Sequence, residues 1–476
     1  MSAPPVSVPE TGATADAAHT GPGAGGAGGA GVRRAPLILR NRAFGAVWLG
    51  QVLTQAAVRM LQVGVSWWIV AHAVRDAPGL ASGLFMAVCT LPAVALAPVV
   101  AGTVARFAHR SVLRTAAALA GAASGALALW AYADGPPLTA VYAAALAVAT
   151  CQAFFDPCLT TSVPELVDDA DIETATGFEL STQSLAGLGG ALLGALTVDR
   201  AGVAGLAAGC AAAYLGAALL VASARFRTAS STATTPTTAS AATTASGPAA
   251  AVPRRRGLRR ILGELPYVRR ILYCFTAANL FTTAVFVVIP LYTRSVLQGG
   301  GGTVALLEAS LGTGALIGAF TGTRVPGRPT VAGAYCLALM ALALAVPGLV
   351  AHRLAVAGCL AVAGWCAGAV GVRFVALFQR LVPAADKPGF FAVMQAVLGA
   401  SLPVASLVFG SAGDFLSPRT LCLVQGVGMV PAICALALLG SRDPVPPPAD
   451  PCPGTDAGTD AGTDADRAPE AVGGER

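Results

Sequence analysis

Polar side chains within long apolar stretches are the residues of this sequence that could do chemistry. Gln51, Gln55, Arg59 and Gln62 lie in one such stretch at spacings of three and four. That spacing places all four on one face of a helix. A face of this kind, turned toward a water-filled cavity, could bind a small molecule or help to move protons. The alternative is that Arg59 forms a buried pair that only stabilises the structure.

Further polar residues lie alone in other apolar stretches. Asp156 precedes Pro157, and Glu308 stands among small residues. Each carboxylate could carry a proton, but Asp156 could also be solvated at a helix end, and Glu308 could form a gating hydrogen bond. Arg373 could face the same cavity or extend to the surface. Asn279 could bind substrate or simply join two helices.

The elements that position these residues follow from composition. The chain has 476 residues, of which 55% are hydrophobic and 11% charged. Soluble domains have about 25% charged residues, so lipid is the expected solvent for most of the chain. This excludes an ordinary cytosolic enzyme, a disulfide-rich secreted domain and a disordered scaffold.

Charge and cysteine usage narrow the function further. The net charge of +6 comes from residues at the ends of apolar stretches, which favours membrane topology over nucleic-acid binding. Eleven cysteines occur without a Cys-x-x-Cys pair, and the four histidines lie far apart. The spacing of metal ligands is therefore missing, and we expect neither a metal nor another cofactor.

Twelve apolar stretches are each long enough to cross a bilayer, which requires roughly 20 residues. They are residues 44–71, 80–104, 112–133, 138–163, 176–198, 203–224, 268–292, 303–323, 330–350, 354–381, 390–412 and 419–439. The predicted fold is an all-α integral membrane protein with two six-helix repeats around a central cavity. We expect a disordered cytoplasmic tail (1–35), a first half (36–223), a cytoplasmic basic linker (224–266), a second half (267–440) and a second disordered cytoplasmic tail (441–476).

Arginine positions predict the orientation in the membrane. Arginines concentrate before the first stretch, after the second, in the linker and after the eighth, whereas each loop on the other side has one. Because basic residues favour the cytoplasmic side, both termini are predicted to be cytoplasmic. Residues 254–270 alternate arginines with apolar residues, which suits anionic lipid on that face. A plain topogenic signal is the alternative.

The two blocks share landmarks at similar offsets. Gly102-Thr and Gly322-Thr each precede a turn that contains arginine, and the fifth and eleventh stretches both close on an aspartate, Asp199 and Asp414. Parallel repeats of this kind are a transporter architecture, with the binding site at the repeat interface near the bilayer midplane.

Ordered motifs give the chain a family resemblance. They are the opening Leu39-Arg-Asn-Arg-Ala-Phe-Gly-Ala-Val-Trp-Leu-Gly-Gln, then Leu91-Pro92, Phe155-Asp-Pro157 and Gln379-Arg-Leu-Val-Pro383. Over residues 37–440 the chain resembles the major facilitator superfamily, in a drug-efflux branch similar to macrolide-efflux proteins and the enterobactin exporter.

The resemblance implies export by alternating access, with Gly102, Arg106 and Arg110 at a cytoplasmic gate. Ala105 stands where the family usually has an aspartate before the arginine. That departure leaves open a sensor or accessory protein that no longer transports.

These observations predict a monomeric, proton-coupled exporter in a bacterial plasma membrane. Its expected substrate is an amphiphilic small molecule such as an antibiotic or another secondary metabolite. The expected pathway contains Arg59, Arg373, Gln55 and Asn279. Asp156 is the first candidate for the proton carrier and Glu308 is the second.

One alternative is a membrane enzyme of the prenyltransferase kind. In that case Asp168-Asp169-Ala170-Asp171 would hold Mg²⁺. The second half offers no matching acid cluster, so we expect no enzyme.

Overall fold

The computed structural model describes residues 40–167, 171–224, 266–324, 327–383 and 387–440, and the regular structure in these ranges is helical. The first half contains α2 (Arg42–Trp68) with a π-helical turn (Ile69–Ala73), α3 (Pro78–Ala95), α4 (Ala97–Arg106), α5 (His109–Ala133), α6 (Leu138–Leu166) and α7 (Ile172–Ser223). The second half contains α9 (Pro266–Thr283), α10 (Val285–Ser295), α11 (Gly301–Thr321), α12 (Pro329–Ala345), α13 (Arg353–Leu381), α14 (Lys387–Ala412), α15 (Pro418–Gly428) and α16 (Val430–Gly440).

The long helix α7 is two antiparallel passages joined at Gly202. This glycine has a φ of 63°, in the left-handed region that glycine adopts without a steric penalty. Gly194, before the turn, and Gly209, after it, both lie against Met60 of α2. The chain therefore reverses at Gly202 and returns past the same point on α2.

Twelve passages result, as the sequence predicts. Within the described residues, ten helical stretches are long and apolar enough to span a membrane, and residues 185–223 count as one of them. The reversal in α7 divides that stretch into two passages. The twelfth passage is α2, which is not among these ten stretches. It has 27 residues and contains the polar face with Arg59. The predicted helix ends lie within five residues of the observed ones.

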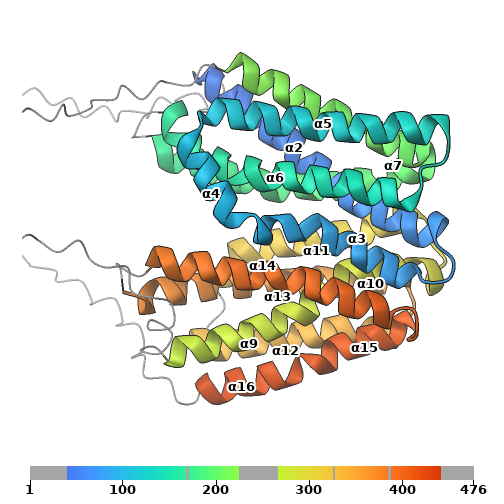
Figure 1. Cartoon of the computed structure of the whole chain (residues 1–476). Coiled ribbons are helices and arrows are strands. Elements are labelled where there is room, and N and C mark those ends of the chain that lie inside the picture. Colours follow the sequence, from blue (N-terminus) through green and yellow to red (C-terminus); the bar gives the residue numbers. More distant parts are fainter. Residues whose placement is uncertain (1–39, 168–170, 225–265, 325–326, 384–386, 441–476) are drawn as a thin grey trace, which may run out of the picture.

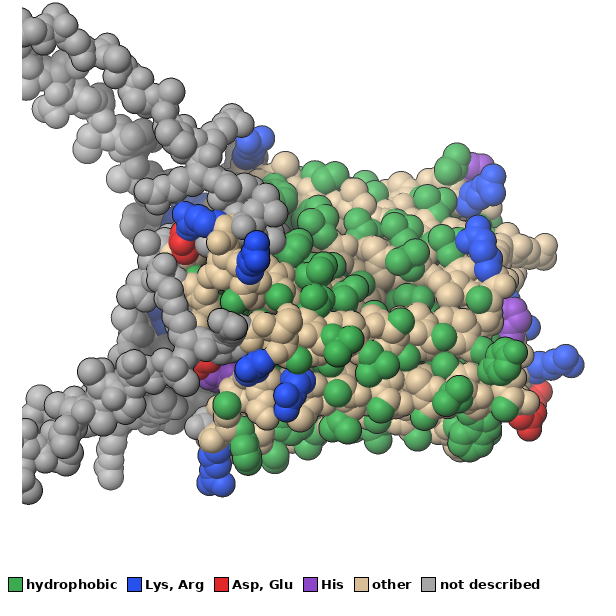
Figure 2. Space-filling model, turned by 90° about the horizontal axis from the view of Figure 1, so that it is seen from above, with side chains coloured by type: hydrophobic (Ala, Val, Ile, Leu, Met, Phe, Trp, Pro, Cys, Tyr) green, Lys and Arg blue, Asp and Glu red, His purple; other side chains and the backbone are tan. Residues whose placement is uncertain are grey.

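The helices run side by side, with the first half above the second in Figure 1. The described segments that begin at Arg40 and Pro266, or end at Ala224 and Gly440, meet at the left of that view; we call this the terminal end and the opposite side the far end. In Figure 2, hydrophobic side chains cover a broad middle band, and charged side chains gather toward the two ends. That distribution is the one expected for a bundle that spans a bilayer.

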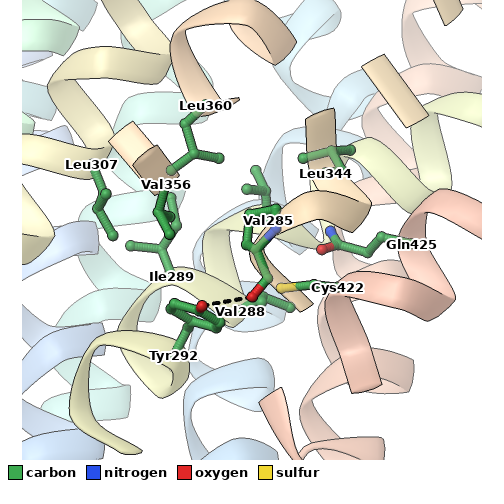
Figure 3. Close-up of a pocket in the computed structure, with 11 residues that line it drawn as sticks. Val285, Val288, Ile289, Tyr292, Leu307, Leu344, Val356, Leu360, Cys422 and Gln425 are labelled. Atoms are coloured by element: carbon green, nitrogen blue, oxygen red, sulfur yellow. Dashed lines mark hydrogen bonds between the residues drawn. The ribbon is translucent and has the colours of Figure 1, made fainter. Parts of the chain in front are cut away.

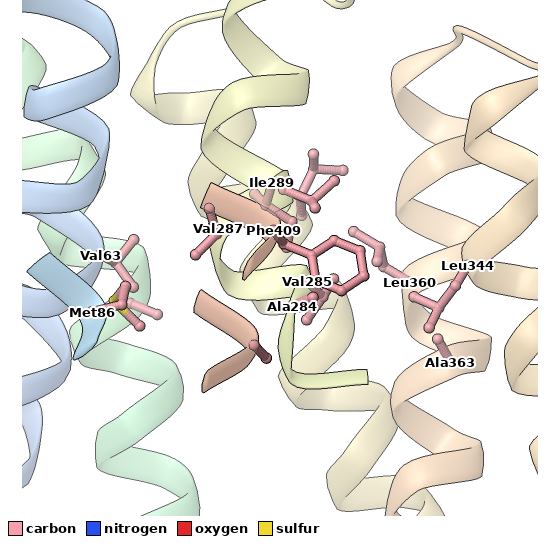
Figure 4. Packing of buried hydrophobic residues seen from close by; sticks show 14 of the residues in the cluster. Val63, Met86, Ala284, Val285, Val287, Ile289, Leu344, Leu360, Ala363 and Phe409 are labelled. Carbon is pink, nitrogen blue, oxygen red and sulfur yellow. The ribbon is translucent and has the colours of Figure 1, made fainter. Parts of the chain in front are cut away.

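The halves pack through one continuous apolar core. Val63 and Met86 of the first half belong to the same buried cluster as Val287 and Phe409 of the second (Figure 4). Helices α3 and α14 approach closely because Gly83 has no side chain, and a Cβ there would lie 2.2 Å from the Ser406 carbonyl oxygen. Small residues permit such contacts between membrane helices.

Candidate functional site

An ion pair joins the two halves inside the bundle. Arg59 of α2 and Glu308 of α11 have 3.9 Å between a guanidinium nitrogen and a carboxylate oxygen. The Glu308 side chain is 4% exposed and that of Arg59 is 28% exposed. The other guanidinium nitrogen donates a hydrogen bond to Gln62 Oε1 at 3.0 Å, and the ring centre of Phe286 lies 5.1 Å from Arg59 Cζ.

Glu308 lies deeper than the sequence suggests. The predicted stretch begins at residue 303, which would leave Glu308 about one turn from the helix end. In the structure α11 begins at Gly301, so Glu308 is about two turns inside. It is the only charged residue among the buried polar side chains of the described ranges. The Glu308 carboxylate therefore lies in the interior of the helix bundle.

A cavity of about 290 Å³ lies against this ion pair, between α7 of the first half and α10 and α11 of the second. Apart from the pair its lining is apolar: Gly187, Leu188, Ala191, Phe286, Leu311, Gly312, Ala315, Leu316 and Ala319. From Glu308 to Ala319 it follows α11 for about 16 Å at 1.5 Å per residue. That direction leads toward the terminal end. The volume is at the lower limit for small-molecule sites.

A second polar cluster lies within the first half. Asp156 of α6 accepts hydrogen bonds from Gln55 Nε2 at 2.8 Å and from Gln152 Nε2 at 2.6 Å. Gln55 is one helical turn from Arg59, so the polar face of α2 touches both predicted carboxylates. Arg59 reaches Glu308 across the halves, while Gln55 reaches Asp156 within one half.

The remaining predicted pathway residues lie elsewhere in the second half. Asn279 of α9 donates to Ser401 Oγ at 2.5 Å and to the Leu398 carbonyl at 3.3 Å, and so joins α9 to α14. This contact favours the helix-joining role of Asn279. Arg373 is half-buried in α13, eight residues before the end of that helix.

The predicted gate residues lie near the terminal end of the first half. Gly102 and Arg106 are exposed on α4, and a Cβ added to Gly102 would have no neighbour within 4 Å. Arg110 of α5 donates to the carbonyl of Ala222 in the same half. Among the described residues, this contact of Arg110 stays within the first half, so the gate remains a prediction.

Two sequence features fall partly or wholly outside the described residues. The acidic run includes residues 168–170, which are not described, and Asp171, which forms an ion pair with Arg40. The basic run at residues 254–260 also lies outside the described ranges.

Two residues at the polar clusters have weak sequence signals. Gln152 is four residues before Asp156, which indicates a shared helix face. Phe286 is one aromatic residue in an apolar stretch, and nothing in the sequence marks it as a neighbour of Arg59.

A smaller cavity lies wholly within the second half. It measures about 20 Å³ and is lined by residues such as Val288, Leu360 and Gln425 (Figure 3). Tyr292 donates a hydrogen bond to the Pro347 carbonyl at its edge, at 2.6 Å. This space holds about one water molecule and is too small for a substrate. The cavity at the Arg59–Glu308 pair is the candidate site because it lies between the two halves beside their ion pair.

The fold and this interface define a transporter of two six-helix halves, and comparison with known proteins identifies the family. The model of the Major Facilitator Superfamily matches residues 47–350. The chain belongs to that superfamily. No curated protein matches it.

Solved structures share the fold at low sequence identity. A bacterial homologue of the human lysosomal transporter Spinster, inward-facing and unoccupied, has a TM-score of 0.63 and 11% identity, covering 84% of this chain and 96% of the other. An inward-facing bacterial homologue of the iron transporter ferroportin has a TM-score of 0.62 and 12% identity, covering 84% and 99%. A D-xylose–proton symporter has a TM-score of 0.61 and 12% identity, covering 84% and 95%.

Proposed function

We propose that this secondary transporter exports an amphiphilic small molecule from a bacterial cell in exchange for protons. The observation that carries the proposal is the Arg59–Glu308 pair, which joins the halves beside an otherwise apolar cavity. An apolar wall suits the hydrocarbon part of a substrate, and the ion pair suits its polar part. Export follows the resemblance to the efflux branch.

The far end corresponds to the outside of the cell in this proposal, because the arginine distribution assigns the terminal end to the cytoplasm. At the far end Arg294 of α10 donates a hydrogen bond to the Val70 carbonyl of the first half. The cavity extends from the ion pair toward the terminal end. Both features support an inward-facing state that is closed on the outside.

The proposed mechanism uses the charge of Glu308. When Glu308 is ionised, its attraction to Arg59 favours contact between the two halves at this point. In the state that is open to the outside, a proton neutralises the Glu308 carboxylate, and the halves then rearrange to the inward-facing state without this charge. Release of the proton to the cytoplasm restores the pair, and the inward-facing cavity can accept the next substrate.

The test is efflux from a pump-deficient bacterium loaded with a panel of amphiphilic antibiotics, with and without a protonophore. The wild-type chain is expected to expel at least one compound, and the protonophore is expected to stop it. Glu308→Gln should abolish the protonophore-sensitive part because the amide side chain does not ionise. Asp76→Asn, at an exposed far-end carboxylate, is the matched control and should transport as the wild type does.

Export that persists in Glu308→Gln with full sensitivity to the protonophore would overturn the role of Glu308. Efflux that ignores the protonophore would overturn proton coupling. Failure of the wild-type chain to expel any compound, when it is well expressed and inserted, would count against an amphiphile exporter and favour the sensor alternative.

A further inference from the structure

Two aspartates at the far end each bind the backbone of the opposite half. Asp414, just after α14 in the second half, accepts hydrogen bonds from the N–H groups of Gly79 at 2.8 Å and Leu80 at 2.9 Å. Both N–H groups belong to the first turn of α3 in the first half. The carboxylate of one half therefore caps a helix of the other.

Asp199 makes the equivalent contact in the opposite direction. It lies at the far end of the first passage of α7, and Oδ2 accepts a hydrogen bond from Gly301 N–H, the first residue of α11 in the second half. Its other oxygen, Oδ1, accepts from Trp67 Nε1 at 2.7 Å, which holds the carboxylate in place. The fifth and eleventh passages thus cap the eighth and second, as repeat symmetry would require.

Neither capped helix has a side-chain cap from its own N-cap residue. The N-cap residue of α3 is Ala77 and that of α11 is Gly300, and neither makes a side-chain capping bond. By contrast, Asn41 caps α2 and Ser417 caps α15 within their own segments. The first N–H groups of a helix lack partners inside the helix and attract negative charge. At α3 and α11 these N–H groups bind a carboxylate of the opposite half, that of Asp414 or Asp199.

The helices approach closely enough for this because glycines lie at the contacts. A Cβ on Gly301 would lie 2.2 Å from the Ala195 carbonyl oxygen, and one on Gly79 would lie 2.4 Å from that of Gly410. Separation of the halves at the far end would break both contacts and leave both helix ends uncapped.

We propose that Asp199 and Asp414 are positioning residues of the transport cycle: two equivalent carboxylate caps that hold the far end closed and set the balance between the two access states. The proposal rests on the alternating access of the proposed function, but on neither its substrate nor its coupling ion. Loss of one cap shifts the equilibrium toward the state open at the far end by about fivefold, the effect expected for a helix N-cap. Because the halves separate as rigid units, loss of either cap weakens both contacts.

Amide hydrogen exchange followed by mass spectrometry tests this without substrate or a proton gradient. The full chain is studied in lipid nanodiscs as the wild type, Asp199→Ala, Asp414→Ala and the double variant. The control is Asp134→Ala, because Asp134 is an exposed far-end carboxylate that bonds the N–H of its neighbour Gly135 in the same loop. Peptides from the starts of α3 and α11 report the far end, and peptides from α4 and the end of α13 report the terminal end.

The result expected is reciprocal. Asp414→Ala should raise exchange by about fivefold at the start of α11 as well as α3, and Asp199→Ala should do so at α3 as well as α11. Terminal-end peptides should become more protected in both variants. Asp134→Ala should leave all four peptides as in the wild type.

Faster exchange confined to the helix next to each substituted aspartate would overturn the proposal, since an ordinary local cap predicts that outcome. Unchanged exchange in both peptides would overturn it as well. If an alanine variant does not fold, Asp199→Asn and Asp414→Asn remove the charge and keep one acceptor, and the same reciprocal pattern is expected at smaller size. Absence of antibiotic efflux with reciprocal exchange intact would contradict the proposed function alone.

Discussion

Arg59 and Glu308 lie 3.9 Å apart although they belong to different halves of the molecule. The carboxylate is buried and the guanidinium is largely so, and Phe286 and Gln62 flank the arginine. A charge inside a membrane protein is costly unless it is paired or hydrated. The pair is therefore a bond between the halves, and in the proposed function the charge of Glu308 controls it.

Thermal unfolding of the purified protein should reveal this coupling. Arg59→Gln is expected to destabilise the protein because it leaves the Glu308 carboxylate buried without its cation. Adding Glu308→Gln should recover part of the loss, with a coupling energy of about 1 to 3 kcal/mol. Arg270→Gln, at an exposed position on α9, is the control. Additive effects of the two substitutions would show that the charges do not interact.

Asp156→Asn tests the other predicted proton carrier. Gln55 and Gln152 both donate to Oδ1 of Asp156, and Asn keeps an oxygen acceptor, so we expect the variant to fold and insert. If Asp156 carries protons, which is one role of intramembrane carboxylates, loss of the ionisable group should lower protonophore-sensitive efflux roughly tenfold. The measurement is initial efflux rate at matched expression. Full retention of proton-dependent transport would assign the carrier role to Glu308 alone.

Three glycine substitutions separate contacts across the halves from contacts within one half. Gly83→Ala pushes against Ser406 of the other half, so it should favour opening at the far end. Gly194→Ala pushes against the Met60 carbonyl of its own half, at 2.4 Å, and should lower stability by about 1 to 3 kcal/mol. Gly102→Ala, with nothing within 4 Å, should do neither.

Hydrogen exchange and thermal unfolding are measured on all three glycine variants. Equal loss of stability in Gly83→Ala and Gly194→Ala, with no change in far-end exchange, would contradict the distinction between the two contacts.

The orientation of the bundle is tested with a protease site inserted between Asp134 and Gly135, in an exposed far-end loop. The arginine distribution predicts that this site is cleaved by protease added to intact cells. A tag at the C-terminus should survive until the cells are opened. The reverse pattern would mean that the far end faces the cytoplasm, and the proposed direction of transport would then reverse.

The sequence alone determined the helical passages and their two-fold organisation. Hydrophobic length and turn residues are local properties, so helix ends such as those of α5 and α13 follow from neighbouring residues. The polar face of α2 is also local, since helical periodicity places Gln55 and Arg59 together. The mean hydropathy of α2 is below that of the other spanning helices. Its length and its flanking turn residues nevertheless predict a membrane passage.

Tertiary structure decided which charges meet. Arg59 could pair with Asp156 or with Glu308, and residue types do not distinguish these two possibilities. Helix α7 packs against both α2 and α11 and so places Arg59 within reach of Glu308, while Asp156 of α6 meets Gln55 of α2. The aspartates at 199 and 414 were visible as a repeat, but their partners are backbone N–H groups, which every non-proline residue carries. Only the approach of the two halves selects the N–H groups of Gly79, Leu80 and Gly301.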